Sequence, residues 1–143
     1  MGIKLGIMKI NYLLAACVFL TSCSVQKNRV KNDWINLFKD YAMYKCACEV
    51  TGDKLEPLLW TTKDISFTVN KEVLGNYGDK ADSVGRFYAK GIQPIAVDPE
   101  HDLYGMKRMF VGCLDFYKSD SLDKIAKAAY RQYRAEKKTK SSK

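Results

Sequence analysis

From residue 33 onward, apolar residues recur at intervals that predict amphipathic helices. The clearest pattern covers residues 103–133. One apolar face falls at Leu103, Met106, Phe110, Cys113, Leu114 and Tyr117, and a second at Leu122, Ile125, Ala126, Ala129, Tyr130 and Tyr133. Between them, Asp120 is a candidate helix cap, with Asp123 three residues later as in a capping box. The pattern therefore predicts a hairpin of two helices that lie close together across a short corner.

An earlier helix is predicted to begin near Trp34, with Asn32 or Asp33 as its cap and with Gly52 and Asp53 at its end. Its apolar face is wide and rich in aromatic residues: Trp34, Leu37, Phe38, Tyr41, Ala42, Cys46 and Val50. We expect this helix to pack against the C-terminal hairpin.

The segment between these helices is less regular. Residues 55–60 are apolar but contain Pro57, which predicts a loop or a single turn. In residues 65–73, alternating apolar positions favour a strand, whereas the spacing of four between Ile65, Val69 and Val73 favours a helix. We predict a helix, because no second strong strand lies nearby to pair with, and we expect Gly75 and Gly78 to end it.

A short helix is predicted over residues 80–90, closed by Gly91, and a loop over residues 92–102, which contain two prolines. The residues expected to point inward from this helix are Ala81, Val84, Phe87 and Tyr88. The fold class expected is therefore all-α, a single compact domain of about five helices over residues 33–136. The C-terminal hairpin would pack on the N-terminal helix, and residues 137–143 would form a basic tail.

The first 22 residues have the features of a bacterial lipoprotein signal. They carry Lys4 and Lys9 without an acid, then an apolar run, then the sequence Leu-Thr-Ser-Cys that ends at Cys23. The run is too short for a permanent membrane span. Leu-Ala-Ala-Cys, ending at Cys17, also fits the signal, but cleavage there would expose residues 18–20. We therefore predict cleavage before Cys23, a lipid on its sulfur, and a polar tether over residues 23–32.

The charge of the chain is concentrated near its C-terminus. The net charge is +8, and residues 131–143 hold six basic residues against a single acid, Glu136. A nucleic-acid-binding domain would need a basic patch on its folded surface, so we do not expect nucleic acid as a partner. The tail is expected to be a solvated helix end that makes at most weak contact with anionic lipid headgroups.

Export would place the mature cysteines in an oxidising compartment. Apart from Cys23, the mature chain has three: Cys46, Cys48 and Cys113. On a helix, Cys46 and Cys48 point about 200° apart, so only one of them can face Cys113. A disulfide from one of the two to Cys113 is expected, with the other left over.

No pattern in the sequence predicts catalysis, a metal or a cofactor. His101 is the only histidine, and together with the Cys-x-Cys pair of Cys46 and Cys48 it supplies too few ligands for a structural zinc site. The acidic positions 98, 100 and 102 resemble the start of a calcium loop, but Leu103 stands where glycine is required and Met109 where a bidentate carboxylate is required. We therefore expect a protein that acts by binding and is not an enzyme.

Two blocks, KDYAMYKCACEV (residues 39–50) and GCLDFYKSDSLDKIAKAAY (residues 112–130), resemble the first and last helices of the type VI secretion amidase-immunity proteins. The resemblance implies an all-helical fold, often a homodimer, that binds a peptidoglycan amidase effector in the periplasm and occludes its Cys–His cleft. It also implies a disulfide between Cys46 and Cys113, which leaves Cys48 spare. The chain departs from the family in its lipoprotein signal and in the extra Cys48.

The loop that would enter the amidase is expected to be the segment that mixes acidic and aromatic groups. Its candidate residues are Asp98, Glu100, His101, Asp102 and Tyr104. The turn that contains Tyr77 is the second choice. The expected location is the periplasm, with a lipid anchor in the inner or outer membrane of a diderm bacterium. The alternative hypothesis is a structural or tethering envelope lipoprotein with no toxin partner.

Overall fold

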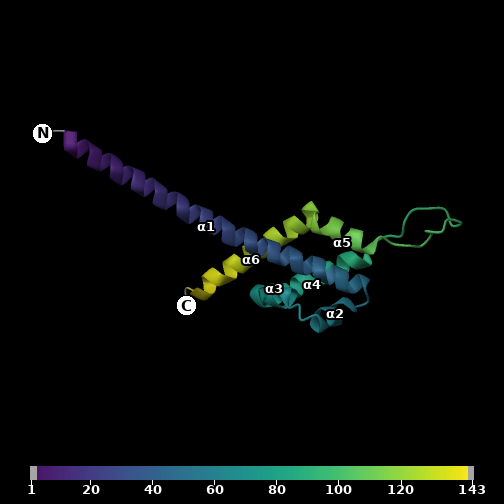
Figure 1. Cartoon of the computed structure of the whole chain (residues 1–143). Helices are drawn as coiled ribbons and strands as arrows, with labels where there is room; N and C mark the ends of the chain where they lie inside the picture. The colour runs from purple at the N-terminus through teal and green to yellow at the C-terminus, as the bar shows by residue number, and fades with distance from the viewer. Residues whose placement is uncertain (1–2, 142–143) are drawn as a thin grey trace. The chain divides into compact units, whose positions relative to one another are not determined.

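A computed structural model describes the backbone of residues 3–141 and the side chains of residue 26 and residues 28–141. Within this range the chain is all-helical, as predicted, and contains no strand (Figure 1). The helices are α1 (Ile3–Val50), α2 (Leu55–Thr61), α3 (Ser66–Leu74), α4 (Asn76–Lys90), α5 (Met109–Tyr117) and α6 (Asp120–Ser141). Among the described residues, no helix is both long enough and apolar enough to cross a membrane.

The chain divides into two compact units, one up to Asp33 and one from Trp34 onward. In the first unit, α1 is helical through residues 23–32, for which the sequence predicts a tether. The prediction that a helix begins near Trp34 is therefore wrong. Residues 23–33 contain no proline or glycine that would interrupt a helix. The side chains of Cys17 and Cys23 lie outside those described, so lipidation stays a prediction.

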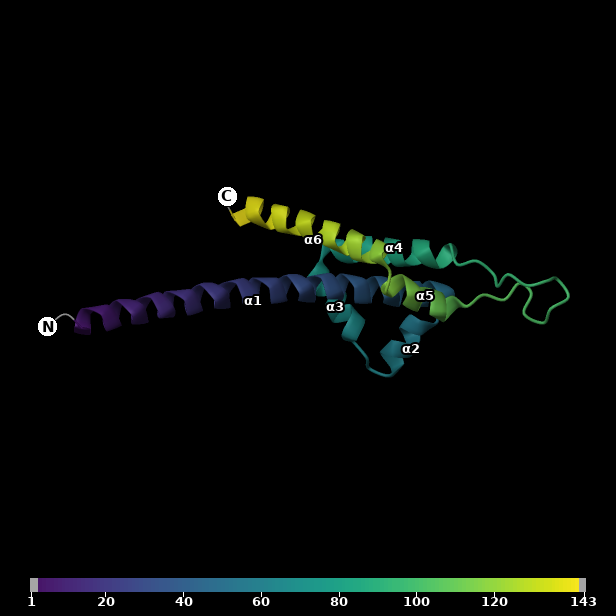
Figure 2. The ribbon, with the colours of Figure 1, turned by 90° about the horizontal axis from the view of Figure 1, so that it is seen from above.

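The core of the second unit is built around the part of α1 that follows residue 33. The helices α4 and α6 lie on one side of it and α2 and α3 on the other (Figure 2). The ring of Trp34 lies between 5.2 and 5.9 Å from the rings of Phe38, Tyr77, Tyr130 and Tyr133. These contacts join α1 to α4 and α6, as expected for an N-terminal helix packed on the C-terminal one.

A glycine allows α4 and α1 to approach very closely. Gly85 is buried in the middle of α4. A Cβ atom placed there would overlap the carbonyl oxygen of Ala42 and lie 3.0 Å from the backbone nitrogen of Cys46. Because these neighbours are backbone atoms of α1, they cannot move aside as a flexible side chain can. The separation of the two helices is therefore set by the absence of a side chain at residue 85.

Charged groups fix the end of α1 against α4 and α2. The guanidinium of Arg86 contacts the carboxylates of Asp82 at 2.7 Å, Glu49 at 2.8 Å and Asp53 at 2.9 Å. Its hydrogen bond lowers the pKa of Asp53. On the neighbouring turn, the buried ammonium of Lys45 lies 3.1 Å from a carboxylate oxygen of Glu56 in α2. The network satisfies the buried charges and joins three helices.

The predicted C-terminal hairpin is present, but its first helix is shorter than expected. The second apolar face is confirmed, with Leu122, Ala126, Ala129 and Tyr130 buried. The first helix begins at Met109 and not at Leu103, because Gly105 has a φ of +75°, which an α-helix cannot contain. On this helix, Phe110 and Leu114 are exposed and the buried positions are Cys113 and Phe116.

The cap of α6 also differs from the prediction. The hydroxyl of Ser119 accepts a hydrogen bond from the backbone N–H of Leu122 at 3.2 Å, so Ser119 is the cap and Asp120 is not. The carboxylate predicted to complete a capping box, that of Asp123, instead forms ion pairs with Lys39 and Lys127.

Three further predictions in the middle of the chain can be compared with the structure. The helix chosen for residues 65–73 is confirmed as α3, and Gly75 ends it with a φ of +56°. Residues 55–61, where a loop or a single turn is predicted, form a short helix. Pro57 stands in the first turn of this helix, where a missing N–H costs nothing. The predicted stop at Gly78 is wrong, because that glycine lies inside α4.

Candidate functional site

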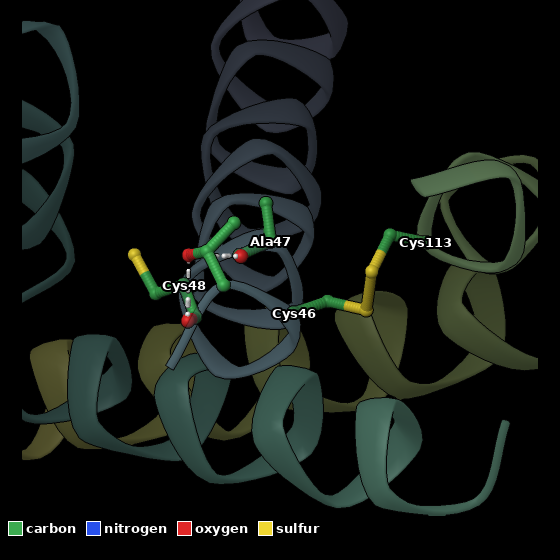
Figure 3. The surroundings of a disulfide bond; sticks show 5 residues. Cys46, Ala47, Cys48 and Cys113 are labelled. Atoms are coloured by element: carbon green, nitrogen blue, oxygen red, sulfur yellow. Dashed lines mark hydrogen bonds between the residues drawn. A yellow bond between two sulfur atoms is a disulfide. The ribbon is translucent and has the colours of Figure 1, made fainter. Parts of the chain in front are cut away.

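A disulfide joins α1 to α5 where the sequence resemblance implies one. The sulfur atoms of Cys46 and Cys113 are 2.05 Å apart, and the two residues are separated by 67 positions in the chain. Figure 3 shows Cys48 pointing to the other side of α1, as the helical geometry predicts. Cys48 is a buried free thiol whose pKa is raised by burial. Of the two pairings open from geometry, the structure has Cys46–Cys113.

The disulfide lies at the base of a long loop between α4 and α5, residues 91–108. Ala89 at the end of α4 is buried against the disulfide, and Tyr88 and Ile92 pack around it. Both stems of the loop are thus held by the same small core: α4 by packing and α5 by a covalent bond. In Figures 1 and 2 the loop extends away from the helices of its unit.

The loop is closed by backbone hydrogen bonds. The N–H of Ile95 donates to the carbonyl of Met106 at 2.7 Å and joins its two arms. Beyond this bond, the N–H of His101 donates to the carbonyl of Asp98, and that of Tyr104 donates to the carbonyl of His101. Residues 98–105, which we call the loop tip, therefore have a defined path although all of them are exposed.

The loop tip brings together the residues predicted to contact a partner. Asp98, Glu100 and Asp102 are exposed, and none of these carboxylates has an ion pair within the described part of the chain. Nδ1 of His101 accepts a hydrogen bond from the N–H of Leu103 at 3.1 Å, so a neutral ring carries its proton on Nε2. The side chain of Tyr104 is also exposed. The loop tip thus presents three carboxylates as acceptors, an imidazole N–H as a donor and an aromatic ring.

Tyr77, the second choice for a partner contact, lies elsewhere. The segment predicted to be a turn is the first part of α4, and the side chain of Tyr77 is only 9% exposed. Its hydroxyl donates a hydrogen bond to Glu136 of α6 at 2.8 Å. The residue is placed by its packing between helices, and it does not belong to the loop tip.

The burial of Tyr77 predicts a loss of stability at alkaline pH. Burial and the hydrogen bond to Glu136 raise its pKa to about 12 from an ordinary value of 10.0. The folded state therefore keeps this proton when the unfolded chain has lost it, so stability falls as pH rises from about 10 toward 12. We expect Tyr77→Phe to reduce the fall in urea midpoint between about pH 9 and pH 11. An equal fall in both proteins would assign the effect to other groups, such as Tyr41, whose pKa burial also raises.

One aromatic residue of α4 is exposed although its spacing predicts a buried position. Phe87 was expected to point inward, but its side chain is 80% exposed. It stands between two apolar hollows of about 540 and 470 Å³, both of which Tyr88 also lines. Helical spacing alone predicts that Phe87 is buried in the core. Only the tertiary packing of α4 shows which of its apolar residues remain outside.

The described residues hold no group of three or more side chains that could bind a metal ion. The histidine is in the exposed loop tip, and the free cysteine is buried on α1. Comparisons of this chain with protein-family models, with curated proteins and with solved structures found no match.

Proposed function

We propose that this protein is an immunity protein that binds and inhibits a peptidoglycan amidase effector of type VI secretion. The observation that carries the proposal is the disulfide between Cys46 and Cys113 within an all-helical domain. This is the pairing that the resemblance of residues 39–50 and 112–130 to the amidase-immunity family implies. The protein needs no catalytic group of its own in this role.

The loop tip is the proposed inhibitory element. An inhibitor that enters a Cys–His cleft must present polar groups to the catalytic residues and must pay little entropy to order its loop on binding. The loop tip carries Asp98, Glu100 and Asp102, and its stems are held by the disulfide core. A carboxylate placed beside a catalytic histidine would be favoured by the charge of the protonated imidazole.

The proposed location is the periplasm, with the mature chain anchored by a lipid on Cys23. A membrane anchor keeps the inhibitor in the compartment in which the effector cuts the wall. We also propose that the protein acts as a homodimer, as the resemblance implies. Size measurement of the purified protein tests the dimer independently of inhibition.

The proposed function is tested by co-purification. Residues 24–143 retain the whole core, because every described core residue follows residue 33. This chain and the amidase encoded beside it would be co-expressed, and digestion of purified wall would be measured with and without the inhibitor. A stable complex with digestion abolished supports the proposal. Unaffected digestion without a complex would favour a structural or tethering envelope lipoprotein instead.

The loop assignment makes a separate prediction. Replacing Asp98, Glu100 and Asp102 together with alanine is expected to weaken inhibition by about 100-fold or more, since removing one partner of a buried, hydrogen-bonded charge pair costs about 2–5 kcal/mol of binding energy. The matched control is the triple variant Glu72→Ala, Asp115→Ala and Asp120→Ala, which removes three exposed carboxylates outside the loop. If both triple variants inhibit like the wild type, the inhibitory surface is not the loop tip, although the protein could still be an immunity protein.

A further inference from the structure

The last helix carries a straight line of positive charge. Five basic residues on α6 are spaced by three or four positions, which places them on one face of the helix. They are Lys124, Lys127, Arg131, Arg134 and Lys138, which we call the basic stripe. The stripe is about 21 Å long, because each helical residue adds about 1.5 Å. All of its members are exposed except Arg134, which is half-buried.

Most of the stripe is not neutralised by the protein itself. Lys127 pairs with Asp123, which also pairs with Lys39 of α1. The described ion pairs include none of the other four stripe residues. Asp120 and Asp123, both in the first turn of the helix, are the acids on this face. Glu136 is turned away and accepts a hydrogen bond from Tyr77. A surface that collects cations without partners favours an external anion.

The stripe also includes a shallow depression. A hollow of about 290 Å³ is lined by Tyr130, Arg131, Arg134, Ala135 and Lys138. The aromatic rings of α6 do not add to it as stacking surfaces: Tyr130 and Tyr133 are packed against Trp34. Single-stranded nucleic acid is bound by a basic groove together with exposed aromatic rings. The stripe has the cations of such a site without the exposed rings.

We propose that the basic stripe docks α6 on an anionic phospholipid surface. Charge complementarity is the basis of this proposal, because the negative headgroups of a bilayer match a straight row of long, flexible cationic side chains. The stripe would act beside the lipid proposed on Cys23, and it would fix which side of the domain faces the membrane.

The basic stripe and the loop tip belong to different elements of the unit. The stripe lies on α6, whereas the loop leaves its unit at the start of α5 and extends away from α6 (Figure 2). None of the stripe residues belongs to the loop tip or to the disulfide at its base. The proposal does not depend on the identity of the partner that the loop binds.

Vesicle binding tests the proposal with matched lysine pairs. Residues 24–143, without lipid, would be mixed with vesicles of phosphatidylcholine alone or of phosphatidylcholine with phosphatidylglycerol. The stripe variant is Lys124→Gln with Lys138→Gln. The control is Lys137→Gln with Lys140→Gln, which removes the same charge from exposed positions of α6 that lie off the stripe. Circular dichroism establishes that both variants keep the helical fold.

We expect the protein to bind the vesicles that contain phosphatidylglycerol and not those of phosphatidylcholine alone. This binding should weaken as the salt concentration rises. Each Lys or Arg near such a surface strengthens binding about fivefold, so the stripe pair should weaken it about 25-fold. The control pair should change it only a few-fold. Equal weakening by both pairs would overturn the proposal, because net charge and not the stripe would then be responsible. Stripe-dependent binding to a single-stranded oligonucleotide without vesicle binding would overturn it as well.

Discussion

Replacing Gly85 with alanine is expected to destabilise the protein by about 2–3 kcal/mol. The added methyl group would overlap the carbonyl oxygen of Ala42, and the backbone of α1 would have to move away from α4. Alanine is favoured over glycine within a helix by about 1 kcal/mol, so the predicted loss is what remains after that gain. The free energy of unfolding in urea measures the effect directly.

Gly112→Ala is the control for this substitution. Gly112 also lies within a helix, but the nearest atom to its added Cβ is Cδ1 of Ile92, at 2.8 Å. That atom is the end of a flexible side chain and can move aside, so we expect a change below about 1 kcal/mol. Similar losses in the two variants would show that the contact between α4 and α1 at Gly85 is no tighter than an ordinary contact.

The periodicity of apolar residues predicted the fold class and the buried face of α6. It succeeded there because Leu122, Ala126, Ala129 and Tyr130 face a continuous core along the helix. The same reasoning failed at residues 103–108, where Leu103 and Met106 have helical spacing but belong to the loop. Gly105 has a positive φ, which interrupts any helix through these residues. The sequence alone does not show which glycines adopt a positive φ.

The candidate site was predictable in part. Prolines and charged residues identified residues 98–104 as part of an acidic and aromatic loop. These features can be read from neighbouring residues alone, without knowledge of the tertiary packing. The exposure of Phe87 and the burial of Tyr77 were not predictable, since both depend on how α4 lies against α1 and α6. The choice of Cys46 over Cys48 came from a family resemblance. Helical geometry could show only that the two thiols face different ways.

Removing the disulfide is expected to cost about 4 kcal/mol of stability. The bond closes a loop between residues separated by 67 positions, and chain entropy assigns such a loop between about 3 and 4.7 kcal/mol. The total stability of a small domain is on the order of 5–15 kcal/mol, so the loss is a large fraction of it. The double variant Cys46→Ala with Cys113→Ala would be compared with the wild type by urea unfolding, with and without a reducing agent.

The control is Cys48→Ala, which removes a buried thiol but leaves the disulfide intact. It should cost about 1 kcal/mol and should respond to reducing agent as the wild type does. Reduced wild type and the double variant should unfold alike, because both lack the covalent link. A wild type whose stability did not fall on reduction would show that packing alone holds α5 on α1.

The stems of the loop between α4 and α5 would then need no disulfide to position the loop tip, and loop-dependent inhibition should survive reduction. If inhibition is instead lost on reduction while the helices remain folded, the disulfide positions the inhibitory loop.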